Sequence, residues 1–314
     1  MLMLDIESGS VGVALARLSS NHLPKVFGEW RRAVPLQLTH DTDTLARQTE
    51  VVVEAALAHV AEVAARVRGH HTHGAVGEVQ DAAVFLSPPW GALSITNRKL
   101  EPHPFTKRLQ KSLEAFFGPL TVTTEPFGLM AAHTAPLVLP NEGHYLLSTV
   151  SGETTELILL ENEGSHLHIA AHATLPLGHH YPLRTLLSHG AFSPAEARSA
   201  LHLHARGSAP GHALEALHAA GTHVAAEFAS VAGELLPHTQ ARSIFVVAGE
   251  PTGEWFARSL AASPALGQLF PQAGEVRAVR SGHVSPFVGG HARRPDLPLL
   301  LEALFVNTRF NSAV

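Results

Sequence analysis

The sequence predicts an α/β protein built from two similar domains, and three observations support this. A strand hairpin opens the chain, and a second hairpin of the same design appears near its middle. Each hairpin continues into a third strand that ends in Pro-Leu, at Pro35-Leu36 and at Pro176-Leu177. Helices and single buried strands then alternate, as in α/β layers. We therefore expect one domain at 1–140, a second at 141–295, and a C-terminal helix at 296–308 that packs back on the first.

The first half of the chain shows the pattern element by element. A strand breaks at a small polar turn, residues 7–10, resumes, and is followed by strand-like residues at 25–38. Apolar residues then recur every three or four positions up to Gly69, which predicts a long helix capped by Thr42 or Asp43. The other expected elements are a buried strand at 83–90 stopped by two prolines, a helix near 105–117, a strand at 121–124 and a helix near 127–135.

The second half repeats this opening. Residues 144–177 have the pattern of three strands joined by turns at 151–154 and 161–164. Ser193, followed by Pro194 and then by Glu196 three positions on, forms a capping box that predicts a helix start. The remaining expected elements are helices near 179–189, 194–205, 211–236, 252–262 and 297–306, and strands at 243–249 and 275–279.

Composition narrows the function classes. The chain has 314 residues, 45% of them hydrophobic, and a net charge of -5 without blocks of either sign, so we expect no nucleic-acid binding. The absence of cysteine excludes disulfides and thiolate chemistry. No secretory signal pattern and no run of about eighteen apolar residues is present, so we expect a cytoplasmic protein without direct membrane insertion. The apolar tail around Glu302 is expected to pack on the first domain.

Histidine is abundant, with 23 residues. His166 and His168 would share one face of a strand, and a cluster occurs at 70–73, but no spacing matches a zinc site. Solvated faces and loops are the favoured interpretation, and any role of these histidines stays open.

The two hairpin tips are the best candidates for chemistry. Tips rich in Ser, Gly and Thr expose backbone N–H groups and hydroxyls in a concave arrangement that suits a polyphosphate. One such tip alone is more often only a tight turn, but its duplication favours an anion site. Two tips on opposite sides of a shared cleft would hold one nucleotide between two domains.

Three segments resemble motifs of the actin-like ATPase superfamily, which includes actin, heat-shock chaperones and sugar kinases, and are most similar to its bacterial FtsA and PilM branch. "LDIESGSVGVAL" resembles the first phosphate motif, "STVSGETTEL" the second, and "IFVVAGEPTGEWFARSL" the adenosine motif. The resemblance covers nearly the whole chain. It implies a duplicated RNase H-like fold with a nucleotide-type cleft between the two actin-like domains.

The resemblance also implies ATP and Mg²⁺ as cofactors, with Asp5 as the metal ligand. No catalytic residue is identified. The residues that it implies for nucleotide binding are Asp5, Ser8, Gly9, Ser10, Ser151, Gly152, Glu153, Thr154, Thr155, Gly249 and Glu250.

The motifs depart from the family pattern at several positions. Glu7 stands at the first glycine position, where its carboxylate would oppose a triphosphate, and Thr149 stands where the second aspartate belongs. Ser151 and Ala248 replace two further glycines. No aspartate lies between residues 82 and 295, so the second half lacks both the family's second aspartate and the base that sugar kinases use. Glu153 or Glu156 are the carboxylates that could take the metal-binding role there.

The resemblance therefore implies a scaffold related to FtsA and PilM that acts in cell division, type IV pilus assembly or another envelope machine. Such a pseudo-ATPase would bind nucleotide weakly or not at all and would work through protein partners, a peptide from a membrane protein or self-association. One alternative is an active ATPase of the same fold that uses Asp5 and Glu153 around magnesium. A second is a small-molecule kinase of the sugar type, against which the missing aspartate base argues.

Overall fold

The chain forms two compact units in a computed structural model. One unit comprises Met1–Val138 and Ser281–Val314, and the other Leu139–Arg280. The structure describes residues 1–19, 22–39, 41–69, 78–91, 93, 104–139, 143–163, 166–190, 192–209, 211–236, 241, 243–270, 275–290 and 292–313. Each unit contains one five-stranded mixed sheet with helices, which confirms the predicted α/β class with two similar domains.

The first unit is built on a sheet with the strand order β3-β2-β1-β4-β5. Strands β1, β2 and β3 form an antiparallel meander, whereas β4 and β5 extend the sheet in parallel from β1. Every residue of the central strand β1 is buried, as expected for a strand covered on both faces. The strands are β1 (Leu2–Ile6), β2 (Ser10–Arg17), β3 (Lys25–Ala33), β4 (Asp81–Leu86) and β5 (Thr121–Pro126).

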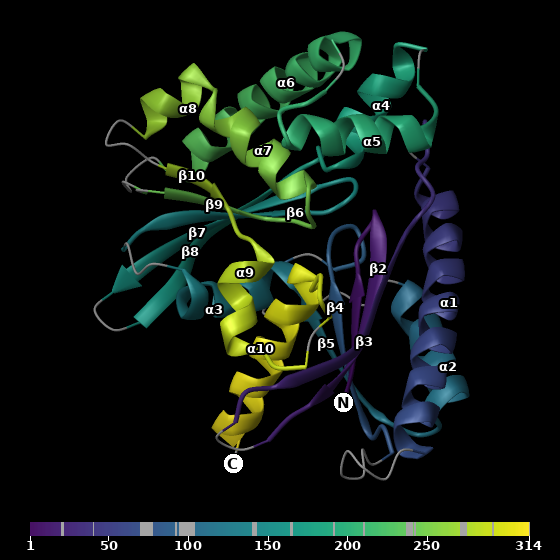
Figure 1. Cartoon of the computed structure of the whole chain (residues 1–314). Coiled ribbons are helices and arrows are strands. Elements are labelled where there is room, and N and C mark those ends of the chain that lie inside the picture. Colours follow the sequence, from purple (N-terminus) through teal and green to yellow (C-terminus); the bar gives the residue numbers. More distant parts are fainter. Residues whose placement is uncertain are drawn as a thin grey trace. The chain divides into compact units, whose positions relative to one another are not determined.

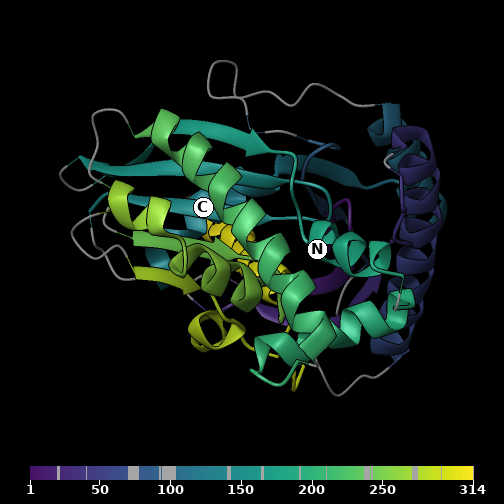
Figure 2. The same cartoon turned by 90° about the horizontal axis from the view of Figure 1, so that it is seen from above.

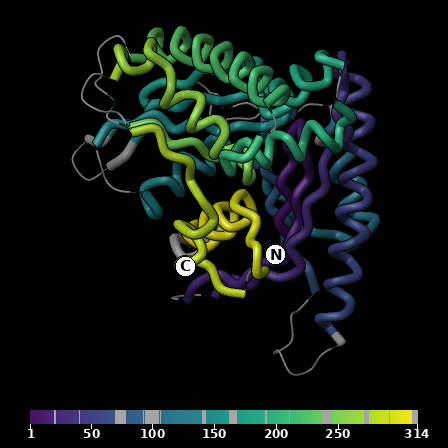
Figure 3. The backbone as a smooth tube through the Cα atoms, turned by 45° about the horizontal axis from the view of Figure 1, so that its top comes forward, coloured from purple at the N-terminus to yellow at the C-terminus, as the bar shows by residue number. Residues whose placement is uncertain are grey.

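Helices cover both faces of this sheet. Helices α1 (Thr42–Gly69) and α2 (Pro104–Phe117) lie on one face, and α3 (Phe127–Val138) and α10 (Leu297–Ala313) on the other (Figure 1). Residues Leu297 to Val306 are buried, so the apolar tail packs within the first unit as expected. Figure 3 shows this C-terminal segment beside the N-terminal strands.

Residues 281–295 belong to the first unit, although the sequence pattern placed them in the second. The reason is a backbone contact with the edge strand β3. Gly289 accepts a hydrogen bond from the N–H of Val26 (2.8 Å) and donates one to the carbonyl of Pro24 (2.8 Å). The short helices α9 (Ser281–Val284) and η2 (Ser285–Phe287), which the sequence did not predict, precede this contact.

The second unit repeats the same strand plan. Its sheet has the order β10-β9-β6-β7-β8, in which β6, β7 and β8 form the antiparallel meander and β9 and β10 run parallel to β6. The duplicated three-strand unit predicted from the sequence is therefore present. The strands are β6 (Tyr145–Val150), β7 (Thr155–Glu163), β8 (His166–Leu175), β9 (Ser243–Val247) and β10 (Glu275–Ala278).

Among the described residues of this unit, five helices accompany the second sheet. Helices α6 and α7 pack on its strands, and α6 crosses over them in Figure 2. The capping box at the start of α5 is present, since Ser193 N donates to Glu196 Oε2 (2.7 Å) and Glu196 N to Ser193 Oγ (3.3 Å). The helices are α4 (His180–Ser188), α5 (Pro194–Ala205), α6 (Gly211–Leu235), α7 (Thr252–Ala261) and α8 (Pro264–Leu269), of which α8 was not predicted.

A few boundaries differ from the sequence pattern. Both meanders end before their Pro-Leu pairs, because proline cannot donate to the strand ladder. The turn expected at 161–164 begins later, since β7 continues to Glu163. Asp41 rather than Thr42 or Asp43 precedes α1 and accepts from the N–H of Asp43 (3.2 Å).

The histidine cluster at 70–73 lies outside the described residues. No helix within the described ranges is long and apolar enough to cross a bilayer.

Candidate functional site

The first candidate hairpin joins β1 to β2. The N–H of Glu7 donates to the carbonyl of Ser10 (3.0 Å) and closes the turn, while Gly9 accepts from Val34 (2.9 Å). Asp5 lies near the end of β1 and is almost fully buried at 1% exposure. The turn therefore holds the Asp5 carboxylate and the Ser8-Gly9 backbone in fixed positions at one end of the sheet.

An arginine on the neighbouring strand reaches across this hairpin. Arg31 on β3 is in register with Gly12 on β2, which is in turn in register with Asp5 on β1. A Cβ atom at position 12 would lie only 2.5 Å from Nη2 of Arg31, so glycine is needed for the guanidinium to pass. Nη2 of Arg31 contacts Oδ2 of Asp5 at 2.5 Å.

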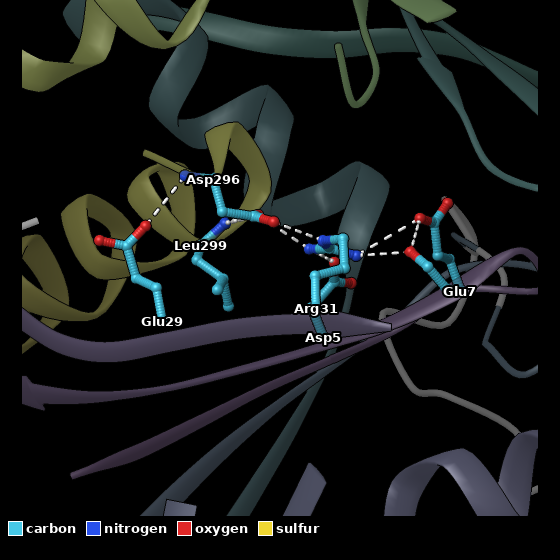
Figure 4. A network of polar contacts seen from close by, with 7 residues as sticks. Asp5, Glu7, Glu29, Arg31, Asp296 and Leu299 are labelled. Atoms are coloured by element: carbon cyan, nitrogen blue, oxygen red, sulfur yellow. Dashed lines mark hydrogen bonds and ion pairs between the residues drawn. The ribbon is translucent and has the colours of Figure 1, made fainter. Parts of the chain in front are cut away.

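The same guanidinium also binds three other side chains (Figure 4). Its Nε and Nη2 donate to the two carboxylate oxygens of Asp296 at 2.5 and 2.9 Å, in a bidentate pair. Its Nη1 donates to Ser10 Oγ at 2.8 Å and lies 3.4 Å from Oε1 of Glu7. Arg31 is thus the shared cation of the first hairpin.

Asp296 comes from the far end of the chain and is held there by its own contacts. It caps α10, because Oδ1 accepts from the N–H of Leu299 at 3.2 Å and its carbonyl accepts from Leu300 at 3.0 Å. Glu29 on β3 accepts hydrogen bonds from the N–H groups of Asp296 (2.9 Å) and Ala292 (2.6 Å). The start of α10 is therefore fixed against β3, next to Arg31.

The first hairpin carries more carboxylates than cations. Glu302 on α10 is completely buried, and neither of its oxygens bonds to another group in the described part of the chain. Burial raises the pKa of Glu302 well above its usual range, and the charge of Asp5 raises it further. Burial likewise raises the pKa of Asp5 despite the opposing charge of Arg31, and raises the pKa of Glu7 to about 7.

These contacts do not fit a magnesium ion at Asp5. Mg²⁺ requires deprotonated oxygen ligands at about 2.0–2.1 Å in octahedral geometry. One oxygen of Asp5 already binds the Arg31 guanidinium, and the pKa of neighbouring Glu7 is raised toward neutrality. The other oxygen, Oδ1, is buried without a hydrogen-bond partner in the described part of the chain, but a cation placed there would lie beside the Arg31 guanidinium and be repelled by it. Within the described ranges no three His, Asp or Glu side chains gather in an arrangement that could hold a metal.

The second candidate hairpin joins β6 to β7 and is held by the start of α4. The N–H of Ser151 donates to the carbonyl of Thr154 (2.9 Å), and the two hydroxyls lie 2.9 Å apart. The carbonyls of Ser151 and Gly152 accept from His179 (2.9 Å) and His180 (2.8 Å). A Cβ at Gly178 would lie 2.4 Å from both of those carbonyl oxygens, so this close approach requires glycine.

An arginine and a histidine hold the single carboxylate at this tip. Oε1 of Glu153 lies 2.8 Å from Nδ1 of His180 and 2.5 Å from Nη2 of Arg184, both on α4. Burial alone would raise the pKa of Glu153, but the hydrogen bonds and charges of His180 and Arg184 outweigh it and lower the pKa to about 2. Glu153 is therefore ionised and paired at neutral pH.

The residues that follow this tip bond to neighbouring strands. Thr155 Oγ1 donates to the carbonyl of Leu177 at 2.6 Å. Glu156 accepts from Thr149 Oγ1 (3.3 Å) and lies 3.2 Å from Nε2 of His172. Thr149, at the position of the family's second aspartate, is buried.

The segment that resembles the adenosine motif follows β9 at the end of the second sheet where the Ser151 turn follows β6. Thr149 on β6 is in register with Val247 on β9, so the Ser151 turn and Gly249-Glu250 follow adjacent parallel strands. Gly249 and Glu250 are exposed, and the carbonyl of Gly249 accepts from Gly253 at 3.3 Å. Asp5, Ser8, Gly9 and Ser10 thus gather in the first unit, and the other predicted binding residues in the second. Their contact with a nucleotide stays a prediction.

Sequence reasoning missed the side chains that bind both hairpin carboxylates. It did not single out Arg31, Asp296, His180 or Arg184. A usable signal existed for Arg31: pairing the three opening strands in register places it beside Gly12, the one position on β2 without a side chain in its path. No comparable signal exists for Asp296, which lies 265 residues further along the chain.

Comparison with solved structures shows the fold. No known family model matches the sequence, and no curated protein is similar to it. PilM in a PilM-PilN type IV pilus biogenesis complex matches 100% of this chain and 98% of its own length at 13% identity, with a TM-score of 0.62. The ethanolamine utilization protein EutJ from Carboxydothermus hydrogenoformans matches 97% of this chain and 89% of its own length at 16% identity, with a TM-score of 0.55. The chain therefore has the two-domain α/β fold of the actin-like ATPases, as its motifs predicted.

Proposed function

We propose that this chain is a non-hydrolysing scaffold of the actin-like fold, which acts by binding other protein chains in pilus, envelope-machine or cell-division assembly. The observation that carries this proposal is the Arg31 guanidinium bound to both Asp5 and Asp296. In the superfamily that the motifs resemble, the carboxylate at the Asp5 position belongs to the metal site.

An internal guanidinium beside Asp5 supplies positive charge there without a metal's ability to orient and activate water. A divalent cation at Asp5 would lie next to the Arg31 guanidinium, which already pairs with Asp5, Glu7 and Asp296, and the like charges would repel each other. We therefore propose that this chain does not hydrolyse ATP.

The partner side of the proposal draws on the likeness to PilM, which is bound to PilN in the solved complex. We extend that behaviour to this chain as a class of partner: a segment of another protein, such as a peptide from a membrane protein, or a second copy of this chain. The wild-type protein, purified from native cells after chemical cross-linking, should carry a defined partner. The complex should re-form from purified components with the same affinity after all nucleotide has been removed. Failure of the purified components to associate would contradict the scaffold role.

Phosphate release tests the absence of hydrolysis. We expect no release from ATP and Mg²⁺ above the buffer rate, and no difference between the wild type and Asp5→Asn. Mg²⁺-dependent release that Asp5→Asn abolishes would instead support the active ATPase. Addition of a panel of sugars tests the kinase alternative, for which a phosphorylated sugar would be the positive result.

A further inference from the structure

A cavity of about 880 Å³ opens among α5, α6, α7 and α8 in the second unit. These helices pack together over one face of the second sheet (Figure 1). Ligand-binding cavities typically measure about 300–1,000 Å³ and combine an apolar wall with a few polar groups. None of the residues predicted to bind nucleotide lines this cavity, so it is distinct from both hairpins.

Most of the cavity wall is apolar. Leu214 and Leu217 of α6 form one side, and Pro264 at the start of α8 forms part of another. Small side chains such as Ala225 and Ala262 leave the space between them open. Leu214 is 36% exposed, so apolar surface is accessible at the mouth. The wall thus suits an apolar ligand body.

The polar groups in the cavity that could bind an anion are a guanidinium and two imidazoles. Arg258, His204 and His218 line it, whereas none of the lining residues is Asp or Glu. The rings of His204 and His218 lie 5.6 Å apart in an edge-to-face arrangement. Nδ1 of His204 is buried and has no hydrogen-bond partner in the described part of the chain. A buried polar atom of this kind favours a ligand that can bond to it.

Arg258 has no carboxylate partner in the described part of the chain. Glu254 precedes it by one helical turn and would be its usual partner at that spacing. The Oε1 atom of Glu254 instead pairs with Nε of Arg280 at 3.0 Å. The contact that remains for Arg258 is a hydrogen bond from Nη1 to the carbonyl of His204 at 3.3 Å. A guanidinium beside an apolar cavity without acidic residues is complementary to an anion.

We propose that this cavity binds an organic anion with an apolar body, namely a medium-chain monocarboxylate whose head group is held by Arg258 and the neighbouring histidines. The apolar chain lies against Leu214, Leu217 and Pro264. This inference is independent of the scaffold function, because it uses no residue of either hairpin.

Calorimetric titration of the full chain with decanoate, below its micellar range, and with decanol tests the proposal. We expect decanoate to bind at least tenfold more tightly than decanol, since a hydrogen bond to a charged group contributes about 1.5–3 kcal/mol. Arg258→Gln should reduce decanoate affinity to about that of decanol. Arg198→Gln, a change at an exposed arginine of α5 outside the cavity, should leave decanoate affinity unchanged.

A second variant keeps the test independent of charge. Thr222→Trp fills the cavity mouth from α6, and should weaken both ligands at least tenfold, whereas Ala219→Trp at an exposed position outside the cavity should not. Circular dichroism and melting curves confirm that each variant is folded. Equal affinity of the wild type for decanoate and decanol, no binding of decanoate, or wild-type decanoate affinity in folded Arg258→Gln or Thr222→Trp would overturn the proposal.

Discussion

The two hairpins share a backbone plan and differ in their charge balance. At the first, the guanidinium of Arg31 pairs with Asp5, Glu7 and Asp296. Glu302, which has no hydrogen-bond partner in the described part of the chain, is buried near Asp5. At the second, the guanidinium of Arg184 and the imidazole of His180, both on α4, contact the single carboxylate of Glu153. Carboxylates therefore exceed cations at the first tip, whereas at the second the one carboxylate is matched by the Arg184 guanidinium. The two units share the strand plan and differ in the charge balance of their tips.

The sources of the stabilising groups differ in the same way. The second tip is closed by α4, which follows its own meander after only a few residues. The first tip is closed by Asp296, at the start of a helix near the other end of the chain. Local sequence determines the second arrangement, whereas the first depends on the folding of the whole first unit.

The largest expected effect comes from removing the shared cation. Arg31→Ala leaves Asp5, Glu7 and Asp296 without their ion pair, and should lower the free energy of unfolding by about 3–5 kcal/mol. Arg32→Ala changes an exposed arginine on the same strand and should cost less than about 0.5 kcal/mol. Urea denaturation measures both, and equal losses would show that Arg31 has no special electrostatic role.

The pKa values of Glu7 and Glu153 are shifted in opposite directions, which predicts opposite responses of stability to pH. The pKa of Glu7 is about 7 in the folded state against an ordinary value of 4.5, so the folded state binds this proton more tightly. Its contribution to stability is present below about pH 4.5 and is lost as the pH rises to about 7, by at most about 3 kcal/mol. Glu7→Gln should reduce this loss of unfolding free energy with rising pH only in part, because the raised pKa of Asp5 acts in the same direction.

Glu153 should show the reverse. Its folded pKa of about 2 lies below 4.5, so its stabilising contribution is present above about pH 4.5 and is lost as the pH falls toward 2. Glu153→Gln should make the free energy of unfolding less dependent on pH below about pH 4.5 only. Unfolding curves recorded from pH 2.5 to 8 distinguish the two variants. Identical pH profiles for both would contradict the assigned charge balance.

Backbone crowding offers a smaller contrast within the second unit. Gly178→Ala places a Cβ about 2.4 Å from two backbone oxygens of the tip and should cost about 1–3 kcal/mol. Gly267→Ala on α8 meets nothing within 4 Å and should be neutral or stabilising, because alanine favours helix. Thermal melting measures the difference, and a neutral Gly178→Ala would mean that α4 does not hold the tip closely.

The smallest effect is expected at Glu302. Burial and the charge of Asp5 raise the pKa of this carboxyl well above its usual range and so favour its neutral form. The amide of Glu302→Gln is a neutral group of similar shape and should change stability by less than about 1 kcal/mol. Glu153→Gln removes an ionised acceptor from Arg184 and His180 and should cost about 2 kcal/mol. A larger loss for Glu302→Gln than for Glu153→Gln at pH 7 would reverse this assignment.

Much of the fold could be predicted because it rests on local patterns. Alternating and helical periodicities of apolar residues predicted most strands and helices, and the repeated three-strand pattern predicted two similar domains. Short helices such as α8 and α9 lack enough residues to show a period. The assignment of 281–295 failed because a single backbone contact at Gly289, invisible in composition, ties that segment to β3.

The candidate site was only partly predictable. Asp5 and the two tips were recognised from motif spacing, and so was the unusual Glu7. Their partners were not, since the reach of Arg31 to Asp5 depends on cross-strand register through Gly12. A bulge between Val13 and Leu15 shifts that register further along the strands. The charge balance of each tip therefore required three-dimensional placement.

The magnesium dependence of ATP binding tests most directly whether Arg31 stands in place of a metal at the first hairpin. We expect calorimetric titrations of the wild type with ATP to give affinities in Mg²⁺ and in EDTA that differ by less than twofold, or to show no binding in either buffer. ATP binding that tightens at least tenfold with Mg²⁺, and loses this gain in Asp5→Asn, would contradict the proposal.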